Sequence, residues 1–158
     1  MSKAYYSTVL TQSPDTIWAL VRDFDNYPRY IDGVVESRIE DGKPGDAVGA
    51  IRSFRMGNNW IRQQLVALSD AERTFTYAGC DPFSFPSGLG DATEAAPAPI
   101  LYVGTLRLAP VVEGGRTFVE RWVTFECGSE DARRWELFLA EAISQWVGSL
   151  ERTLDAAP

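Results

Sequence analysis

The chain has 158 residues, of which 45% are hydrophobic and 23% charged, a composition typical of one globular domain with its own core. Fifteen Lys and Arg against 22 Asp and Glu give a net charge of −7, and the basic residues form no run. Because nonspecific affinity for nucleic acid and for anionic lipid depends on clustered positive charge, neither is an expected partner.

The N-terminal part of the chain predicts one strand followed by two short helices. Residues 3–12 are rich in Tyr, Thr and Val and form the expected strand. Ser13 suits the N-cap of a helix and Pro14 suits its first position, so we expect a helix over residues 15–23. Residues 24–33 contain Pro28 and predict a second, short helix after a break.

Six strand-like segments follow, joined mostly by turn-forming Gly, Asn and Asp residues. They cover residues 34–40, 47–56, 60–68, 73–80, 100–112 and 117–127. Sequential strands with short turns predict an antiparallel meander. The segment 81–99 interrupts this series with four of the nine prolines and predicts a long loop, which in a compact domain is typical of a lid or an interface arm.

The C-terminal part predicts a long amphipathic helix of about 25 residues, with Ser129 as the expected N-cap. From Trp135 to Leu154 its apolar residues recur at intervals of three and four. A seven-stranded antiparallel sheet curved around this helix, with the two short helices between its first and second strands, buries the apolar stripe. We therefore expect one α+β domain over residues 1–155, with a cavity between sheet and helix.

Alternation along the strands predicts two inward-facing arginines. The more apolar face of residues 117–127 contains Arg121, and that of residues 47–56 contains Val48, Arg52 and Phe54. A guanidinium in an apolar pocket is costly unless acceptors or an anion satisfy it. Two interpretations remain open at this point. The side chains reach the rim or pair with an acid such as Glu36, Glu120 or Asp81, or they bind the anionic group of an apolar ligand.

The candidate site combines these arginines with aromatic and amide residues of the same faces. The candidate catalytic residues are Arg121, Arg52, Tyr77 and Tyr102. The candidate ligand-binding residues are Phe54, Gln63, Phe75, Leu106, Val123, Phe138, Ala142 and Trp146. For Tyr77, Tyr102, Gln63 and Trp146, packing alone is the alternative to a functional role.

Histidine is absent from the chain. This excludes Ser-His-Asp and Cys-His nucleophiles, HExxH zinc sites and the His-carboxylate iron triad. Cys80 and Cys127 have no metal-ligand spacing and are expected as reduced thiols buried as small apolar residues. We therefore expect no metal and no cofactor. Acid–base chemistry would depend on Asp, Glu, Tyr, Lys, Arg or bound water.

The segment SPDTIWALVRDF at residues 13–24, followed by YPRY at 27–30, resembles the opening motif of the SRPBCC superfamily of START and birch-pollen-allergen relatives. Matches at residues 44–45, 48–52, 65–70, 73–78 and 102–108 follow in order and look most similar to the polyketide cyclase/dehydrase branch. This resemblance implies the helix-grip fold and a cavity for hydrophobic or aromatic ligands. It also implies that Arg52, Gln63, Tyr77, Tyr102 and Arg121 line this cavity. The chain departs from the pattern at Arg121, often aromatic or acidic in relatives, and in the longer 81–99 segment.

Three functions follow as hypotheses. The first is a cofactor-independent cyclase or dehydratase of lyase or isomerase type, in which Arg121 and Arg52 stabilise an enolate and Tyr77 or Tyr102 transfers a proton. The second is a carrier or sensor of a hydrophobic ligand without catalysis. The third is an interaction module whose 81–99 loop mediates homodimerisation or partner docking. The N-terminus lacks a signal peptide and no apolar stretch spans a bilayer, so a cytoplasmic location without a membrane partner is expected.

Overall fold

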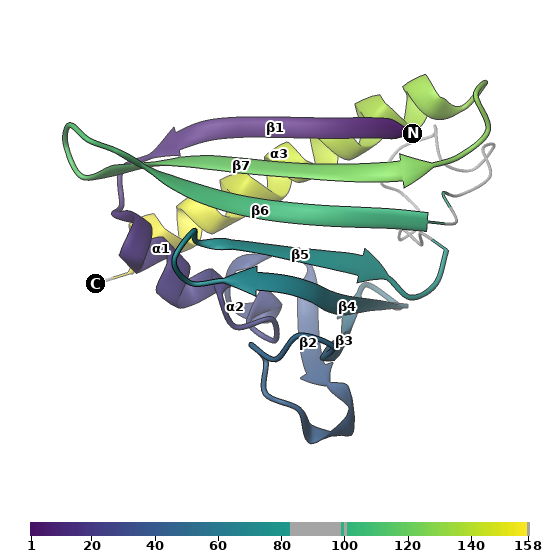
Figure 1. Cartoon of the computed structure of the whole chain (residues 1–158), viewed down its shortest axis with the longest axis horizontal. Helices are drawn as coiled ribbons and strands as arrows, with labels where there is room; N and C mark the ends of the chain where they lie inside the picture. Colours follow the sequence, from purple (N-terminus) through teal and green to yellow (C-terminus); the bar gives the residue numbers. More distant parts are fainter. Residues whose placement is uncertain (83–98, 100, 158) are drawn as a thin grey trace.

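Seven antiparallel strands form one sheet in the computed structural model, which describes residues 1–82, 99 and 101–157 (Figure 1). The strands are β1 (Ser2–Leu10), β2 (Val34–Ile39), β3 (Ile51–Met56), β4 (Asn59–Ser69), β5 (Thr74–Gly79), β6 (Leu101–Val111) and β7 (Arg116–Glu126). Their order in the sheet is β1-β7-β6-β5-β4-β3-β2, so β1 joins the meander at its far edge, beside β7. The predicted antiparallel meander is confirmed, whereas the predicted loop 81–99 lies almost wholly outside the described residues.

Three α-helices complete the fold, and a one-turn 3₁₀ helix, η1 (Glu40–Gly42), follows β2. The helix α1 (Pro14–Val21) begins at the predicted cap, where the Ser13 hydroxyl accepts a hydrogen bond from the backbone N–H of Thr16 at 3.2 Å. The second, α2 (Tyr27–Tyr30), is a single turn. Both lie at one end of the sheet, and the long α3 (Ala132–Ala156) crosses the face of the sheet (Figure 1). This arrangement confirms the helix-grip fold.

Two local predictions are wrong for identifiable reasons. The N-cap of α3 is Asp131 and not Ser129, because the N–H of Asp131 donates to the Gly128 carbonyl at 3.0 Å and forms a turn before the helix. The strand predicted from residue 47 begins at Ile51. The N–H of Ala50 donates to the Ala47 carbonyl at 2.9 Å, so a turn occupies this stretch and Val48 is 60% exposed instead of facing inward.

The core lies between the concave face of the sheet and α3. The buried side of α3 contributes Trp135, Leu139, Ala142, Ile143, Val147 and Leu150, the predicted stripe. The helix packs mainly against β1 and β7. Burial of each such side chain contributes about 1.5–3 kcal/mol, so this stripe holds the helix on the sheet. No helix in the described part of the chain has the length and apolar character needed to cross a membrane.

Candidate functional site

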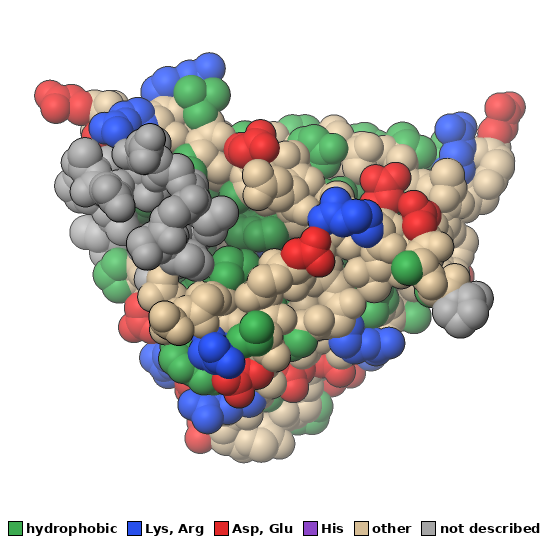
Figure 2. All heavy atoms as spheres, turned by 180° about the vertical axis from the view of Figure 1, so that it is seen from behind, with side chains coloured by type: hydrophobic (Ala, Val, Ile, Leu, Met, Phe, Trp, Pro, Cys, Tyr) green, Lys and Arg blue, Asp and Glu red, His purple; other side chains and the backbone are tan. Residues whose placement is uncertain are grey.

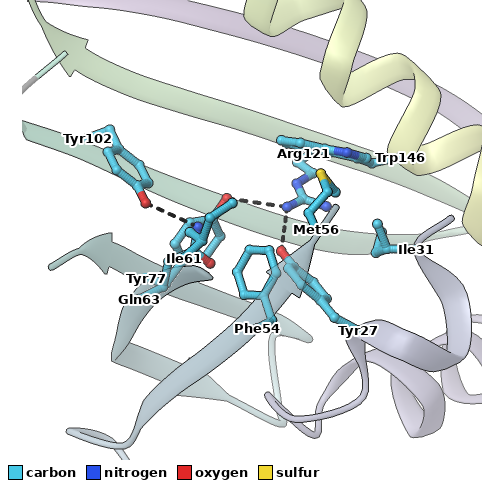
Figure 3. A pocket seen from close by; sticks show the side chains of 10 residues that line it. All are labelled: Tyr27, Ile31, Phe54, Met56, Ile61, Gln63, Tyr77, Tyr102, Arg121 and Trp146. Carbon is cyan, nitrogen blue, oxygen red and sulfur yellow. Dashed lines mark hydrogen bonds between the residues drawn. The ribbon is translucent and has the colours of Figure 1, made fainter. Parts of the chain in front are cut away.

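A small cavity lies between the concave face of the sheet and helices α2 and α3 (Figure 3). Its lining residues come from seven elements and the α2–β2 turn: Tyr27, Ile31, Phe54, Met56, Ile61, Gln63, Tyr77, Tyr102, Arg121 and Trp146. The space open to the centre of a water molecule is ≈ 20 Å³, which is room for about one water. The walls are mostly apolar, and their polar groups are a guanidinium, three phenols and an amide.

Arg121 is the charged group of the cavity wall. Its side chain extends inward from β7 and the residue is only 4% exposed. Its Nη2 donates to the Tyr27 hydroxyl at 2.6 Å and to the Tyr77 hydroxyl at 3.2 Å (Figure 3). The guanidinium carbon lies 4.9 Å from the centre of the Trp146 ring. The Nε of Arg121 is buried and has no hydrogen-bond partner in the described structure.

Arg52 lies beside the cavity but is absent from its lining. It extends from β3 and is fully buried. Its Nε and Nη2 donate to the Gln63 amide oxygen at 3.0 and 2.6 Å, and its Nη1 donates to the Phe24 carbonyl at 3.1 Å. Its guanidinium carbon lies 3.7 Å from the ring centre of Phe24 and 3.5 Å from that of Tyr27. All three nitrogens of this guanidinium are therefore bonded.

The acids considered as partners for the two arginines are engaged elsewhere. Glu36 binds Arg55 at 2.8 Å, Glu120 lies 3.6 Å from Arg107, and Asp81 lies 3.7 Å from Arg62. Pairing of Arg52 or Arg121 with these acids is thus wrong, and neither arginine reaches the rim. Within the described residues, no carboxylate forms an ion pair with either guanidinium.

Two glycines determine where the cavity tyrosines lie. Gly104 of β6 pairs with Tyr77 of β5, and a Cβ at Gly104 would overlap the Tyr77 ring. A Cβ at Gly79 would overlap the Tyr102 ring in the same way. Each ring thus lies across a glycine of the neighbouring strand, an arrangement that no larger residue permits.

The tyrosines of the cavity region differ in acidity. Burial raises the pKa of Tyr30, Tyr77 and Tyr102, although the Gln63 amide, which donates to Tyr102 at 3.4 Å, opposes the rise there. Burial alone would also raise the pKa of Tyr27. The charges of Arg121 and Arg52 and their hydrogen bonds outweigh it, so the pKa of Tyr27 lies below its ordinary value.

The structure brings six of the predicted site residues together on the cavity wall: Arg121, Tyr77, Tyr102, Phe54, Gln63 and Trp146. The other six lie outside this lining. Arg52, Phe75, Leu106, Val123 and Ala142 are buried, and Phe138 is partly buried. Phe75, Leu106 and Val123 extend the inner face of the sheet, and Phe138 and Ala142 belong to α3.

Four lining residues are absent from the candidate site residues, namely Tyr27, Ile31, Met56 and Ile61. Alternation does place Met56 on the inward face of Phe54 and Ile61 on that of Gln63, although neither is among the candidate site residues. Tyr27 and Ile31 lie in α2 and the turn after it. The sequence predicts a short helix there, but a single helical turn has no periodicity that would tell which of its side chains face the cavity.

The two cysteines are free thiols, and one prediction about them is wrong. Cys80 is exposed because it follows the end of β5, and Cys127 is half-buried after β7. Across the described residues, no three His, Cys, Asp or Glu side chains lie close enough to hold a metal ion.

Residues 1–156 match the family described as "Polyketide cyclase / dehydrase and lipid transport". No curated protein matches the chain. Among solved structures, a protein from Thermobifida fusca is 22% identical with a TM-score of 0.78, covering 97% of this chain and 93% of that one. A protein from Nitrosospira multiformis is 24% identical with a TM-score of 0.75, covering 95% and 94%.

A further similar structure has a named role. It is the di-domain ARO/CYC BexL from the BE-7585A biosynthetic pathway, 14% identical with a TM-score of 0.72. The alignment covers 98% of this chain and 47% of BexL. At such identities these likenesses establish the fold alone.

Proposed function

The chain belongs to the polyketide cyclase/dehydrase and lipid transport family, and from this premise we propose that its cavity binds a small, mostly apolar or aromatic molecule with one anionic group. The family description names both enzymes that act on polyketides and transport of lipids. Both kinds of protein handle apolar molecules. The anionic group is not part of the family description and is inferred from Arg121 of this chain.

The unpartnered Nε of Arg121 is the observation that carries this proposal. A buried donor without an acceptor costs about 1–3 kcal/mol, and more on a charged group. A carboxylate, phenolate or enolate oxygen at this position would satisfy the donor and offset the buried charge. Charge-assisted bonds of this kind are roughly twice as strong as neutral ones. The apolar walls, including Phe54, Ile61 and Trp146, would bind the rest of the ligand.

Entry of such a ligand requires side chains to move, because the cavity has room for about one water. Met56 is the most adaptable wall residue, since its unbranched side chain has three rotatable bonds. It also borders an open groove of about 280 Å³ that includes Trp146, Ser149 and Arg152. Rotation of Met56 would enlarge the cavity towards this groove.

The finer form of the proposal is a cyclase- or dehydratase-like reaction. Arg121 would hold a developing enolate, and Tyr77, kept protonated by its burial, would donate its hydroxyl proton to a ligand oxygen. Tyr102, Gln63 and the apolar residues would orient the carbon chain, while Arg52 would maintain the wall behind them. No cofactor takes part in this chemistry.

A carrier or sensor is the second candidate. It is favoured by the absence of histidine from the chain and of carboxylates from the described residues of the lining, which leaves few groups able to abstract a proton. Native mass spectrometry of the freshly purified protein separates the two candidates. A retained, unmodified apolar compound supports the carrier, and conversion of an added aromatic polyketide-like acid supports the enzyme.

The binding proposal is tested with two probes of the same shape, 2-naphthoate and the neutral 2-naphthamide, by isothermal titration calorimetry. We expect naphthoate to bind once per chain, and Arg121→Met to weaken it at least about tenfold while changing naphthamide binding little. Arg107→Met, which removes an exposed arginine of β6, is the matched control and leaves both affinities unchanged. If Arg121→Met lost affinity for both probes equally, or bound naphthoate as tightly as the wild type, the proposal that the ligand has an anionic group would be wrong.

A further inference from the structure

Tyr27 occupies the position between the two buried arginines. Its hydroxyl accepts a hydrogen bond from Arg121 Nη2 at 2.6 Å, and the guanidinium carbon of Arg52 lies 3.5 Å from its ring centre (Figure 3 shows the Arg121 contact). Phe54 and Tyr30 pack edge-on against the same ring at 5.2 and 5.6 Å. The ring is thereby held in place, 4% exposed, with its hydroxyl at the cavity wall.

The charge around Tyr27 is unbalanced. Arginine does not lose its proton in proteins, so this region contains two positive charges. A buried charge without an opposite charge is unfavourable by several kcal/mol. Within the described residues, the guanidinium of Arg121 contacts two hydroxyls and that of Arg52 contacts an amide and a carbonyl. A phenolate is the negative charge that these contacts can form.

Among the described residues, the titratable and charged groups around Tyr27 have consistent effects, and they include Tyr102 of β6, whose pKa is raised by burial. Arg52 comes from β3 and Arg121 from β7, and both favour the phenolate of Tyr27. Tyr77 from β5 and Tyr30 from α2 itself stay protonated, since burial raises the pKa of each. The helix α3 adds the neutral Trp146 over Arg121. Tyr77 also contacts both arginines, but Tyr27 is closer to each: its hydroxyl lies 2.6 Å from Arg121 Nη2 against 3.2 Å, and its ring centre 3.5 Å from the Arg52 guanidinium carbon against 5.1 Å.

We propose that Tyr27 is the acid–base residue of the cavity, its phenolate held between Arg52 and Arg121 until a ligand enters. This inference rests on the proposed function. When the ligand enters as a neutral C–H or O–H acid, that bond breaks and its proton forms the O–H bond of Tyr27. The electron pair stays on the ligand as an enolate or phenolate, which Arg121 then holds. Charge is conserved, because the ligand anion replaces the phenolate beside the guanidinium.

Tyrosinate absorbance tests the phenolate without any ligand. In a titration from about pH 5 to about pH 10, which is the ordinary pKa of tyrosine, we expect one of the six tyrosines to ionise before the others. The early step disappears in Tyr27→Phe, persists in the matched Tyr30→Phe, and moves to higher pH in Arg121→Met. Identical titrations of the wild type and Tyr27→Phe would overturn the proposal.

A second measurement uses the wild type alone and does not depend on how well a variant folds. With ¹³C at the Cζ of tyrosine, each of the six rings gives its own NMR titration. One Cζ resonance should move before the rest, and simultaneous movement of all six would overturn the assignment.

Proton transfer to Tyr27 is tested with 2-naphthol, a neutral O–H acid, by calorimetry in two buffers of different ionisation enthalpy. We compare naphthol with naphthoate at a pH where the early tyrosine is ionised. The anion naphthoate should bind with uptake of about one proton from solvent, and naphthol, which brings its own proton, with none. Tyr27→Phe should abolish the uptake. If naphthoate binding depends on Arg121 but no tyrosine ionises before the others in the titrations, this inference is wrong and the proposed function stands. If one tyrosine ionises before the others but naphthoate does not bind, the proposed function is wrong and the phenolate of Tyr27 stands.

Discussion

Two arginines, equally buried and in contact with the same tyrosine, differ in how completely they are bonded. Arg52 uses all three of its nitrogens and lies between the rings of Phe24 and Tyr27. Arg121 leaves its Nε unpartnered and lines the cavity. The cross-strand neighbours explain the difference. Gln63 faces Arg52 in the β3–β4 register and supplies an amide. Arg121 lies opposite Leu106 of β6 and Tyr6 of β1, and neither accepts a hydrogen bond from its Nε.

This contrast shows that burial alone does not identify a ligand-binding arginine. The exterior of the molecule offers a second contrast, because there the arginines pair with carboxylates, as Arg22 does with Asp46 and Asp70. In the space-filling view, Lys and Arg side chains lie close to Asp and Glu over much of the surface (Figure 2). The interior arginines lack such partners among the described residues, and only Arg121 has bonding capacity left for a ligand.

The largest expected effect is on the free energy of unfolding of Arg52→Met. The substitution leaves the Gln63 oxygen and the Phe24 carbonyl buried without their donors, at a cost of about 2–4 kcal/mol. Below the pH at which Tyr27 ionises, Arg121→Met removes a charge whose partners are two protonated hydroxyls that can reorient, so its free energy of unfolding should stay within about 1 kcal/mol of wild type. Urea unfolding measures both. Equal destabilisation of the two variants would break the contrast.

Gly104→Ala is expected to cost about 1–3 kcal/mol, because the new Cβ overlaps the Tyr77 ring and no flexible side-chain end is available to give way. Displacement of the ring also removes the 3.2 Å contact between Tyr77 and Arg121, so naphthoate binding should weaken. Gly128→Ala is the matched control, since its Cβ would meet only Asp131 at 3.8 Å. Thermal unfolding and calorimetry measure the pair, and wild-type binding by Gly104→Ala would refute the role of this glycine.

Most of the fold could be predicted from the sequence. Period-two alternation marked the strands, and three-and-four spacing marked α3 from Trp135 onwards. Errors came where a turn replaces a regular element, as at Val48 and before Asp131. In both places an N–H donates to the carbonyl three residues before it, and the strand and cap patterns used for the prediction do not reveal such a turn.

The site could be predicted only in part. Strand parity identified Arg52 and Arg121 as inward residues, and both are buried. Parity cannot reveal that Gln63 satisfies one of them, because that depends on the register between β3 and β4. Tyr27 was missed for a related reason: a single turn of helix has no periodicity, and its position over the cavity follows from the packing of α2.

The pH dependence of stability tests the difference between Tyr27 and its neighbours. Tyr30, Tyr77 and Tyr102 have a pKa raised by burial, so above about pH 10 the unfolded chain has lost protons that the folded chain keeps. Stability should therefore fall as pH rises there, by about 1.4 kcal/mol per pH unit for each tyrosine.

The contribution of Tyr27 to the free energy of unfolding changes with pH in the opposite direction, because its pKa is lowered in the folded chain. Stability rises with pH once Tyr27 ionises in the folded chain. The rise ends at the pH where the same tyrosine ionises in the unfolded chain. Urea unfolding of wild type and Tyr102→Phe across the alkaline range measures the slope. A Tyr102→Phe variant that loses stability as steeply as the wild type would contradict the assignment.

The smallest expected effect concerns the aromatic face over Arg121. Trp146 lies 4.9 Å from this guanidinium, while Arg52 has four rings within 5.5 Å. A double-mutant cycle of Arg121→Met with Trp146→Leu should give a coupling free energy of about 0.5–2 kcal/mol, since the pair is shielded from water. The exposed pair of Arg38 and Trp60, 5.0 Å apart, is the matched control and should couple more weakly because solvent screens it. Coupling no larger than that of the control would mean that Trp146 packs against the guanidinium without stabilising its charge. Stabilisation of the Arg121 charge would then depend on Tyr27, on Tyr77 and on the ligand.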